Sequence, residues 1–457
     1  MRTMGWNTAT ASESRRAPAR VAGRRRPKAA LRAGAFAVAL ALIVAACAEA
    51  EEPVAEPEAE PTDEAPADEV DAPEGEPIRV GAIFDETGPI NIYGEHKVNV
   101  TQLAIEALNE QGGVLDRPLE LVMYDAQSSN ELYTQYANQL ILEDEVEVIM
   151  AGITSASREA IRPVINRHDM LYFYNEQYEG GVCDRNVFST GVVPSQQLAA
   201  LIPYGVETFG PEMYVLAADY NYGWISAAWV EEFAAEAGGE VVTDAEFFPL
   251  DVGEFGPAIS AVQAADPDFI VSLLVGGDHI SFYREWTAAG LQDQYPIVSP
   301  TYGLGNEQVI LGEDGEGIVT AFPYYQELDT PENEEFVARW HERFGADYPY
   351  IPDQAVDEWL GWHLWAMAVE QAGTTEKDAV IEALESGLSF DGPGGTVVLD
   401  PPTHHLVKDV HIGIGDGDGG FEIVESFEQV PPAFEQEVCD LIANPDTSTQ
   451  FEPIETD

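Results

Sequence analysis

The chain has 457 residues, of which 45% are hydrophobic and 10% aromatic, enough to bury a large core. Lys and Arg number 21 against 82 Asp and Glu, so the formal net charge is −61. This charge excludes sequence-independent nucleic-acid binding, which requires a basic surface. The apolar run at residues 33–46 is shorter than the roughly 20 residues of a membrane-spanning helix, which excludes an integral multi-span protein.

The N-terminal segment, residues 1–46, has the pattern of an export signal. It contains nine basic residues and one acid, and it ends in the apolar stretch 33–46. Small residues precede Cys47, and this junction resembles a lipobox, which implies that Cys47 becomes the lipidated first residue of the mature protein. The alternative is an ordinary signal peptide with an unmodified cysteine. A start at Met4 or later would also fit the long basic segment.

Residues 47–77 form a predicted acidic, proline-rich tether. Residues 48–77 hold thirteen acids, six prolines and no basic residue. Such a segment repels itself and buries too little apolar surface to fold, so it extends between lipid and domain. The excess of acid continues through the remaining chain. We interpret it as adaptation to high salt, which screens self-repulsion; a partner that binds acidic surfaces is the alternative.

From residue 78 onward, apolar strands alternate with helices. This order predicts α/β architecture with parallel sheets covered on both faces. About 360 residues exceed one such core, so we expect two doubly wound lobes with ligand at the carboxyl ends of the strands. The predicted strands are 78–84, 119–124, 146–150, 170–174, 213–218, 240–247, 269–275 and 295–299. The predicted helices are 94–111, 130–142, one starting near 155, 195–208, 223–237, 255–265 and 279–290.

Two cysteines remain if Cys47 carries lipid. An exported chain meets an oxidising compartment, so Cys183 and Cys439 are expected to form a disulfide. That bond would tie a central loop to the C-terminal tail. Two free thiols are the alternative.

Several stretches of the body resemble type I periplasmic solute-binding proteins. Residues 80–89 (VGAIFDETGP) resemble the opening strand and loop of that family, and residues 104–118 are similar to its first helix and turn. Within the family, the urea- and short-amide-binding branch is the most similar. The similarity to this branch is carried by residues 154–158, Tyr174, 177–180, 186–191, 219–222, 328–333, 372–375 and the pair His404-His405.

The resemblance implies a two-lobed Venus-flytrap protein that delivers a small solute to a membrane permease and its ATPase subunits. We expect an extracytoplasmic, lipid-anchored protein without a cofactor. Urea or a short amide is the first expected solute, and a branched-chain or other small amino acid is the second. A ligand-sensing receptor domain is an alternative of another class. The expected organisation is a signal at 1–46, a tether at 47–77, lobe I at 78–192 and 323–388, lobe II at 193–322 and 389–440, and an acidic tail at 441–457.

Three hydroxyl residues follow a strand of the first predicted lobe. Thr154, Ser155 and Ser157 lie at a strand-to-helix junction, where hydroxyls and free backbone amides suit a carbonyl or carboxylate oxygen. A plain helix cap is the alternative, since Ser and Thr favour that position. Ile153 stands where amide binders of the family carry an aromatic residue.

Tyr174 and Glu176 follow the next strand. The resemblance implies that Tyr174 faces the ligand. Glu176 replaces a small uncharged residue, which makes urea itself a poorer match. Because a buried carboxylate is costly unless paired, Glu176 is expected to bind an ammonium or amide N–H group of the ligand. The alternative is that Glu176 faces solvent.

The second predicted lobe contributes residues at three strand ends. Tyrosines there can close over a solute with ring and hydroxyl, or simply pack between helices. Glycines allow close backbone approach, and Asp278 either caps the next helix or contacts ligand. Tyr324 matches an aromatic position of the family at the crossover between lobes. The candidate ligand-binding residues of this group are Tyr220, Tyr222, Val275, Gly276, Asp278, Tyr302 and Tyr324.

Enzyme motifs are weak in this sequence. It lacks a phosphate loop, a Gly-x-Ser-x-Gly elbow and a His-Glu-x-x-His pair. His404 and His405 would point to opposite faces of a strand and chelate a metal poorly. Residues 416–420 resemble the start of a calcium loop but lack its third oxygen ligand, so we expect a hairpin turn. No metal site and no enzyme activity are expected; a hydrolase using Glu176 and Asp278 is the remaining enzyme hypothesis.

Overall fold

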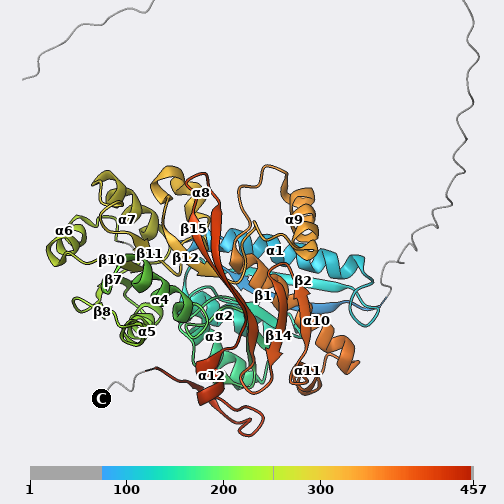
Figure 1. Cartoon of the computed structure of the whole chain (residues 1–457). Helices are drawn as coiled ribbons and strands as arrows, with labels where there is room; N and C mark the ends of the chain where they lie inside the picture. The colour runs from blue at the N-terminus through green and yellow to red at the C-terminus, as the bar shows by residue number, and fades with distance from the viewer. Residues whose placement is uncertain (1–74, 251, 454–457) are drawn as a thin grey trace, which may run out of the picture. The chain divides into compact units, whose positions relative to one another are not determined.

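The computed structural model describes residues 75–250 and 252–453, which form two α/β lobes built on separate sheets (Figure 1). Cys47 and the predicted export signal lie outside the described residues, so lipidation stays a prediction. In the described part of the chain, no helix combines the length and apolar character needed to cross a bilayer.

Lobe I contains a five-stranded parallel sheet in the order β2-β1-β3-β4-β6. Alternate residues of a strand point to opposite faces. Val80 and Phe84 of β1 therefore pack in one core with α1 and α10, whereas Ile83 packs in another with α2 and α3. The elements are β1 (Ile78–Phe84), α1 (Asn91–Glu110), β2 (Leu119–Asp125), α2 (Asn130–Leu142), β3 (Ile149–Ala151), α3 (Ser155–His168), β4 (Tyr172–Tyr174), β6 (Val187–Ser189), α9 (Pro331–Phe344), α10 (Asp353–Ala372) and α11 (Lys377–Leu384).

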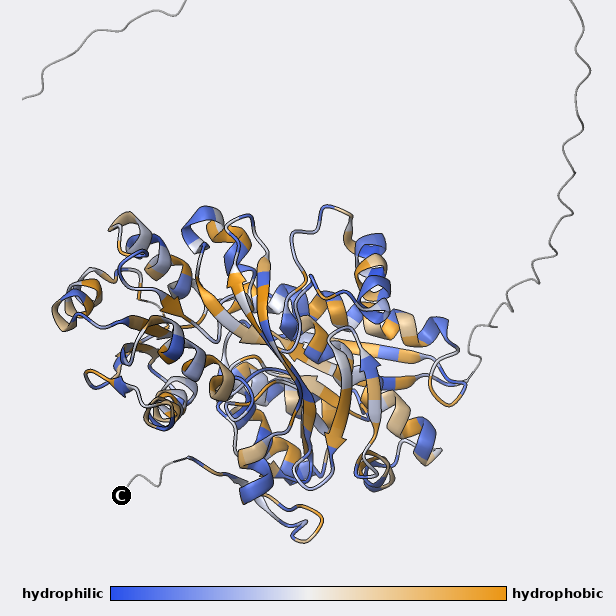
Figure 2. Ribbon diagram, in the orientation of Figure 1, coloured by the Kyte–Doolittle hydropathy of each residue, from blue (hydrophilic) through white to orange (hydrophobic). Residues whose placement is uncertain are grey.

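Lobe II is built on a ten-stranded sheet whose first half is parallel. Leu216 packs with α6 and α7 on one face, and Val215 packs with α4 and α5 on the other. Figure 2 shows apolar residues along the strands and polar ones on the outer turns of helices. The elements are α4 (Leu198–Phe209), β7 (Glu212–Ala218), α5 (Asn221–Ala237), β8 (Glu240–Val241), β9 (Glu246–Phe248), α6 (Gly256–Ala265), β10 (Phe269–Leu273), α7 (Gly277–Ala288), β11 (Ile297–Val298), α8 (Glu307–Leu311), η1 (Gly312–Gly315) and β12 (Val319–Phe322).

The second half of this sheet is antiparallel and consists of β13 (Ser389–Gly392), β14 (Gly395–Asp400), β15 (His405–Gly415) and β16 (Phe421–Val430). Strand β15 connects the lobes. Its Leu406 lies in the core that contains α1 and α10, whereas its Ile412 lies in the core that contains α4 and α5. The predicted boundary between lobes at residue 389 stays a prediction, and β14 contributes Val397 to the lobe I core.

The C-terminal segment returns to lobe I after β16. Helix α12 (Ala433–Val438) is followed by β17 (Ser448–Gln450), which pairs with β5 (Val182–Asp184). Cys183 and Cys439, the two cysteines predicted to pair, form a disulfide with an S–S distance of 2.04 Å. Residues 448–450 of the predicted tail are thus part of a sheet, and a covalent bond holds the segment to lobe I.

The predicted fold class, two α/β lobes with parallel sheets, is confirmed, and most predicted elements lie within a few residues of those observed. One predicted strand, 240–247, is divided into β8 and β9. Both pair with β7, where Val241 is opposite Met213 and Glu246 is opposite Leu216. The outer chain is longer than β7 over this interval, so its intervening residues leave the ladder.

Candidate solute site between the lobes

A small cavity of about 30 Å³ lies between residues of the two lobes. This volume is far below the range of about 300–1,000 Å³ that small-molecule sites occupy, so the lobes are tightly closed and a solute needs them to move apart. Lobe I lines it with Ile90, Tyr93, Ile153, Thr154, Ser155, Glu176 and Gln177. Lobe II lines it with Tyr220, Tyr222, Val275, Thr301 and Leu304. Most of these residues follow strands β3, β4, β7, β10 and β11, so the cavity forms at the carboxyl ends of both sheets.

The start of α3 presents two of the predicted hydroxyl residues to the cavity. Thr154 caps the helix, because its side-chain oxygen accepts a hydrogen bond from the Ser157 N–H at 3.1 Å. Ser155 donates its hydroxyl proton to the buried carboxylate of Glu179. Because the hydroxyl hydrogen of Ser155 is directed to Glu179, its oxygen can accept a hydrogen bond from a solute in the cavity. The cap explanation therefore holds for Thr154, and both residues line the cavity.

Glu176 is the charged residue of the lining, and it is 4% exposed. Lys97 on α1 places its Nζ 3.5 Å from Oε2 of Glu176 but donates its short hydrogen bond to the Asn175 carbonyl. Within the described residues, neither carboxylate oxygen of Glu176 has a hydrogen-bond partner. Burial raises the pKa of Glu176 to about 7, against the opposing effect of Lys97. The site thus holds a buried acceptor that a solute N–H group can satisfy.

Lys97 of α1 also contacts a buried acidic residue of α10. Its Nζ lies 3.9 Å from the Glu358 carboxylate, and burial raises the pKa of Glu358 to about 7. The preceding residue, Asp357, binds Lys408 of the connecting strand β15 at 2.7 Å. These buried ion pairs join α1, α10 and β15, and Lys97 connects them to Glu176.

The two lobes also contact each other at the rim of the cavity. The Gly276 N–H of lobe II donates to the Tyr93 hydroxyl of lobe I at 2.7 Å. Gly276 has a φ of 68°, which glycine adopts without strain. Gln177 of lobe I donates to the Tyr222 hydroxyl of lobe II at 3.4 Å. These bonds describe a closed arrangement in which each lobe completes the walls of the cavity.

Some predicted ligand-binding residues point their polar atoms elsewhere and do not line the cavity. The Ser157 hydroxyl donates to the Thr154 carbonyl, and the Tyr174 hydroxyl donates to the Ile153 carbonyl at 2.8 Å. In lobe II, the Tyr302 hydroxyl donates to the Gly315 carbonyl. These three hydroxyls satisfy buried backbone carbonyls, which is a structural task.

Tyr324, Gly276 and Asp278 take other positions. The Tyr324 hydroxyl donates to Asn333, and its ring packs in the lobe I core, away from the cavity. Gly276 contributes its backbone N–H at the rim. Asp278 lies in the first turn of α7, and its side chain is not among those described.

Six lining residues were not among the predicted site residues: Ile153 and Thr301, which follow strands β3 and β11, and four others. Ile90 and Tyr93 lie at the start of α1, and Gln177 and Leu304 lie in loops beyond the first residues after a strand. A search restricted to strand ends does not reach them. Lys97 did leave a signal in the sequence, because it shares a helical face with Tyr93 at a spacing of four residues, and that face is buried.

No group of three or more His, Cys, Asp or Glu side chains within residues 75–250 and 252–453 is arranged to hold a metal. His404 binds Glu385 and His405 binds Tyr178, so the two neighbouring rings have separate partners. Residues 416–420 connect β15 and β16 as the predicted hairpin turn, in which Asp416 accepts from the Gly420 N–H.

A larger hollow lies on the outer surface beside the C-terminal segment, between α11 and β17. Its two cations are already paired, Arg185 with Asp378 and Lys377 with Asp169. Two further acids of its wall, Asp184 and Glu385, pair with Arg162 and Arg185. The interlobe cavity, with its unpartnered carboxylate, remains the better candidate for a solute site.

Known proteins share this architecture. The family model described as periplasmic binding protein domain matches residues 78–437. The Leu/Ile/Val-binding protein homolog 6 of Brucella melitensis is 22% identical over 344 residues, which cover 73% of this chain and 86% of that protein.

Solved structures give the same result for the fold. A solute-binding protein of an ABC transporter from Rhodopseudomonas palustris, in complex with 3,4-dihydroxybenzoic acid, superposes with a TM-score of 0.71 at 22% identity, covering 78% of this chain and 99% of that one. A leucine-binding protein from Thermotoga maritima gives 0.68 at 20% identity, covering 77% and 99%. With the family model spanning most of the chain and the two-lobed fold in place, this protein belongs to the periplasmic binding protein domain family.

Proposed function

We propose that the protein is the extracytoplasmic solute-binding component of an ABC importer and that it closes its lobes on a small nitrogen-bearing solute. The family and the names of its relatives support the transport role. The observation that carries the solute class is Glu176, a buried carboxylate in the cavity wall with no hydrogen-bond partner among the described residues. A solute that brings an N–H donor removes the cost of leaving this group unpaired.

A small amino acid is the solute that we favour. Its ammonium group would bind Glu176. Its carboxylate would bind at the start of α3, where the N–H groups of Ser155 and Ala156 lie in the first helical turn and have no intrahelical partner. Ile90, Ile153 and Val275 would contact an aliphatic side chain. Two relatives agree with this assignment: one is named as a homolog of Leu/Ile/Val-binding proteins, and the other is named as a leucine-binding protein.

Urea or a short amide is the second candidate. With its pKa raised to about 7, Glu176 is partly protonated near neutral pH and can donate to an amide carbonyl as well as accept from an amide N–H. Such a solute requires less expansion of the small cavity than an amino acid does.

An aromatic acid, the ligand of the Rhodopseudomonas palustris protein, fits this cavity less well. The described lining contains one acid and no Lys, Arg or His, so a solute with a carboxylate and no amine would bring a second negative charge close to Glu176. The lining thereby favours solutes that carry a cationic or N–H-bearing nitrogen.

A thermal-shift screen of the purified mature chain tests the proposed function. Leucine, alanine, urea, acetamide and 3,4-dihydroxybenzoate would be compared in low and molar salt, with calorimetry for each positive result. A bound solute at a hundredfold excess over its Kd stabilises the protein by about 2.7 kcal/mol. We expect an amino acid to give the largest shift. Binding of 3,4-dihydroxybenzoate alone, or product release from any solute, would contradict the proposal.

Attachment to the membrane through Cys47 is part of the same proposal. Mass spectrometry of the mature N-terminus is expected to find a lipidated Cys47, and Cys47→Ser is expected to release the protein from the membrane fraction. An unmodified mature terminus at another residue would support an ordinary signal peptide instead. Copurification with a permease and its ATPase subunits would test the partner assignment.

A further inference from the structure

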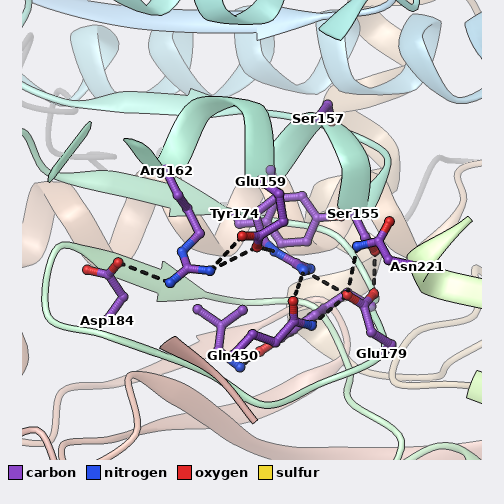
Figure 3. Close-up of polar contacts among 12 residues, drawn as sticks. Ser155, Ser157, Glu159, Arg162, Tyr174, Glu179, Asp184, Asn221 and Gln450 are labelled. Atoms are coloured by element: carbon purple, nitrogen blue, oxygen red, sulfur yellow. Dashed lines mark hydrogen bonds and ion pairs between the residues drawn. The ribbon is translucent and has the colours of Figure 1, made fainter. Parts of the chain in front are cut away.

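Glu179 lies three residues after Glu176 and is almost fully buried. Its Oε1 accepts from Arg158 Nη2 at 2.7 Å, and its Oε2 accepts from the Ser155 hydroxyl (Figure 3). Both donors lie on α3 of lobe I. Ser155 also lines the cavity, so the Glu179 carboxylate directly orients a group that faces the solute.

Two further donors reach the same carboxylate from other parts of the molecule. Asn221, at the start of α5 in lobe II, donates to Oε1 at 3.3 Å. Gln450, on the C-terminal strand β17, donates to Oε1 at 2.6 Å and accepts from Arg158 at 3.1 Å (Figure 3). Trp229 of α5 adds a bond to the Glu179 backbone carbonyl at 3.0 Å. One buried carboxylate therefore joins lobe I, lobe II and the C-terminal strand.

The C-terminal strand is held tightly against this position. The Phe451 N–H donates to the Gly181 carbonyl at 2.8 Å, and Gly181 leaves no room for a side chain because a Cβ would collide with the Phe451 carbonyl. Ser448 donates to Asp184 at 2.7 Å, and the disulfide to Cys439 fixes Cys183, the residue of β5 that precedes Asp184. Gln450 is therefore placed by contacts of its own strand, independently of the cavity.

We propose that Glu179 is a positioning residue that couples the solute cavity to lobe closure, and that the C-terminal strand acts on the site through Gln450. This role rests on the proposed function, in which the lobes open and close. On opening, the Asn221 bond to the carboxylate and the Trp229 bond to the Glu179 backbone carbonyl break, while the bonds from Ser155, Arg158 and Gln450 remain within lobe I. Each closure thus restores a hydrogen bond to a buried charge, and the Ser155 proton stays directed to Glu179 so that its oxygen accepts from the solute.

Distance measurements between the lobes test the coupling without requiring a known solute. Spin labels at Leu142→Cys on α2 and Ile310→Cys on α8, both exposed, would report the interlobe distance in a chain carrying Cys47→Ser. In Asn221→Ala we expect the ratio of closed to open populations to fall about tenfold, the effect of losing one hydrogen bond to a charged group that forms only in the closed state. Gln450→Leu removes a bond that is present in both states, so it should lower the ratio less, by leaving the Glu179 carboxylate less firmly oriented toward Asn221. Thermal unfolding would verify that each variant is folded.

Ser448→Ala is the matched control. Ser448 lies on the same strand as Gln450 but binds Asp184 and Asn166, not Glu179, so the interlobe distances should match those of the unsubstituted chain. If β17 has only a structural role, Gln450→Leu and Ser448→Ala will both lower thermal stability and leave the interlobe distances unchanged. Unchanged distances in Asn221→Ala and Gln450→Leu, or an equal shift in Ser448→Ala, would overturn the role of Glu179. Because no solute is added, that failure is separate from a negative solute screen.

Discussion

Glu176 and Glu179 are buried carboxylates in the same loop after β4, and their surroundings are opposite. Glu179 accepts hydrogen bonds from four side chains, including the fully buried Arg158 at 2.7 Å. Glu176 has a lysine at 3.5 Å and no hydrogen-bond donor in the described part of the chain. The satisfied carboxylate stabilises and orients the site, whereas the unsatisfied one is available to a solute. The number of donors around each acid, more than its burial, separates the two roles.

Replacing Arg158, the residue whose positive charge pairs with Glu179, should have the largest effect on stability. Arg158→Met leaves a buried carboxylate without its ion-pair partner, and we expect the free energy of unfolding to fall by about 3–5 kcal/mol. Denaturant titration measures this change. The double variant Arg158→Met with Glu179→Met, which removes both charges, should recover most of the loss. A loss below about 1 kcal/mol in the single variant would contradict the difference between the two acids.

Glu176→Gln should instead act on binding. The substitution keeps the shape of the side chain and removes the charge, so the affinity for an amino acid should fall by about ten- to a hundredfold, as expected for a bond between charged groups. The free energy of unfolding should stay unchanged or rise, because a poorly solvated charge is removed. Calorimetry measures the first effect and denaturant titration the second. Equal loss of stability in Glu176→Gln and Arg158→Met would contradict the different roles assigned to Glu176 and Glu179.

The pH dependence of stability provides a third comparison. Glu176 has a pKa of about 7 in the folded protein against 4.5 for the free side chain, because burial opposes its ionisation. The folded state therefore holds this proton more tightly; the resulting stability is complete below pH 4.5 and is lost as pH rises through about 7. The difference in unfolding free energy between the unsubstituted chain and Glu176→Gln should change by about 3 kcal/mol across this window. A difference that does not vary between pH 5 and 8 would contradict the raised pKa.

The same titration separates the two candidate solutes. An ammonium group binds the ionised carboxylate, so amino-acid affinity should increase as pH rises through about 7. An amide carbonyl that accepts from the protonated carboxyl should bind more weakly over the same range. Affinities measured by calorimetry at pH 6 and 8 decide between them, with Glu176→Gln as the control that removes the dependence.

Thr154→Ala should have the smallest effect and refines the comparison at the helix that carries both Ser155 and Arg158. Loss of the N-cap of α3 should lower the free energy of unfolding by about 1 kcal/mol. Thr330→Ala, which removes the equivalent cap of α9 away from the cavity, is the matched control. If solute affinity falls only in Thr154→Ala, Thr154 binds solute as well as capping the helix.

The sequence carried enough information for the fold because its signals are local. The apolar strand Ile78–Phe84 and the helix that follows are visible in residue patterning, and their repetition predicts two lobes with parallel sheets. The boundary within 240–247 was missed because it depends on the register that the outer chain adopts against β7, which local patterning does not encode. The antiparallel strand β15, which bridges two cores, likewise depends on contacts distant in sequence.

The site was predicted in part for the same reason. The rule that site residues follow strands selected Thr154, Ser155 and Glu176, and all three line the cavity. It also selected Tyr174, whose hydroxyl turns inward to a buried carbonyl, because strand position alone does not say which way a side chain points. Gln450 binds Glu179 across 271 residues, a pairing that only the folded chain reveals.

The bond between Cys183 and Cys439 closes a covalent ring that contains every strand from β6 to β16 and thus the entire parallel half of lobe II. A protease that cuts once anywhere inside this ring opens it but frees no fragment. The nicked molecule would run as a single species without reductant and separate into two polypeptides after reduction. Cleavage of a surface loop would therefore leave the two halves of the protein covalently joined.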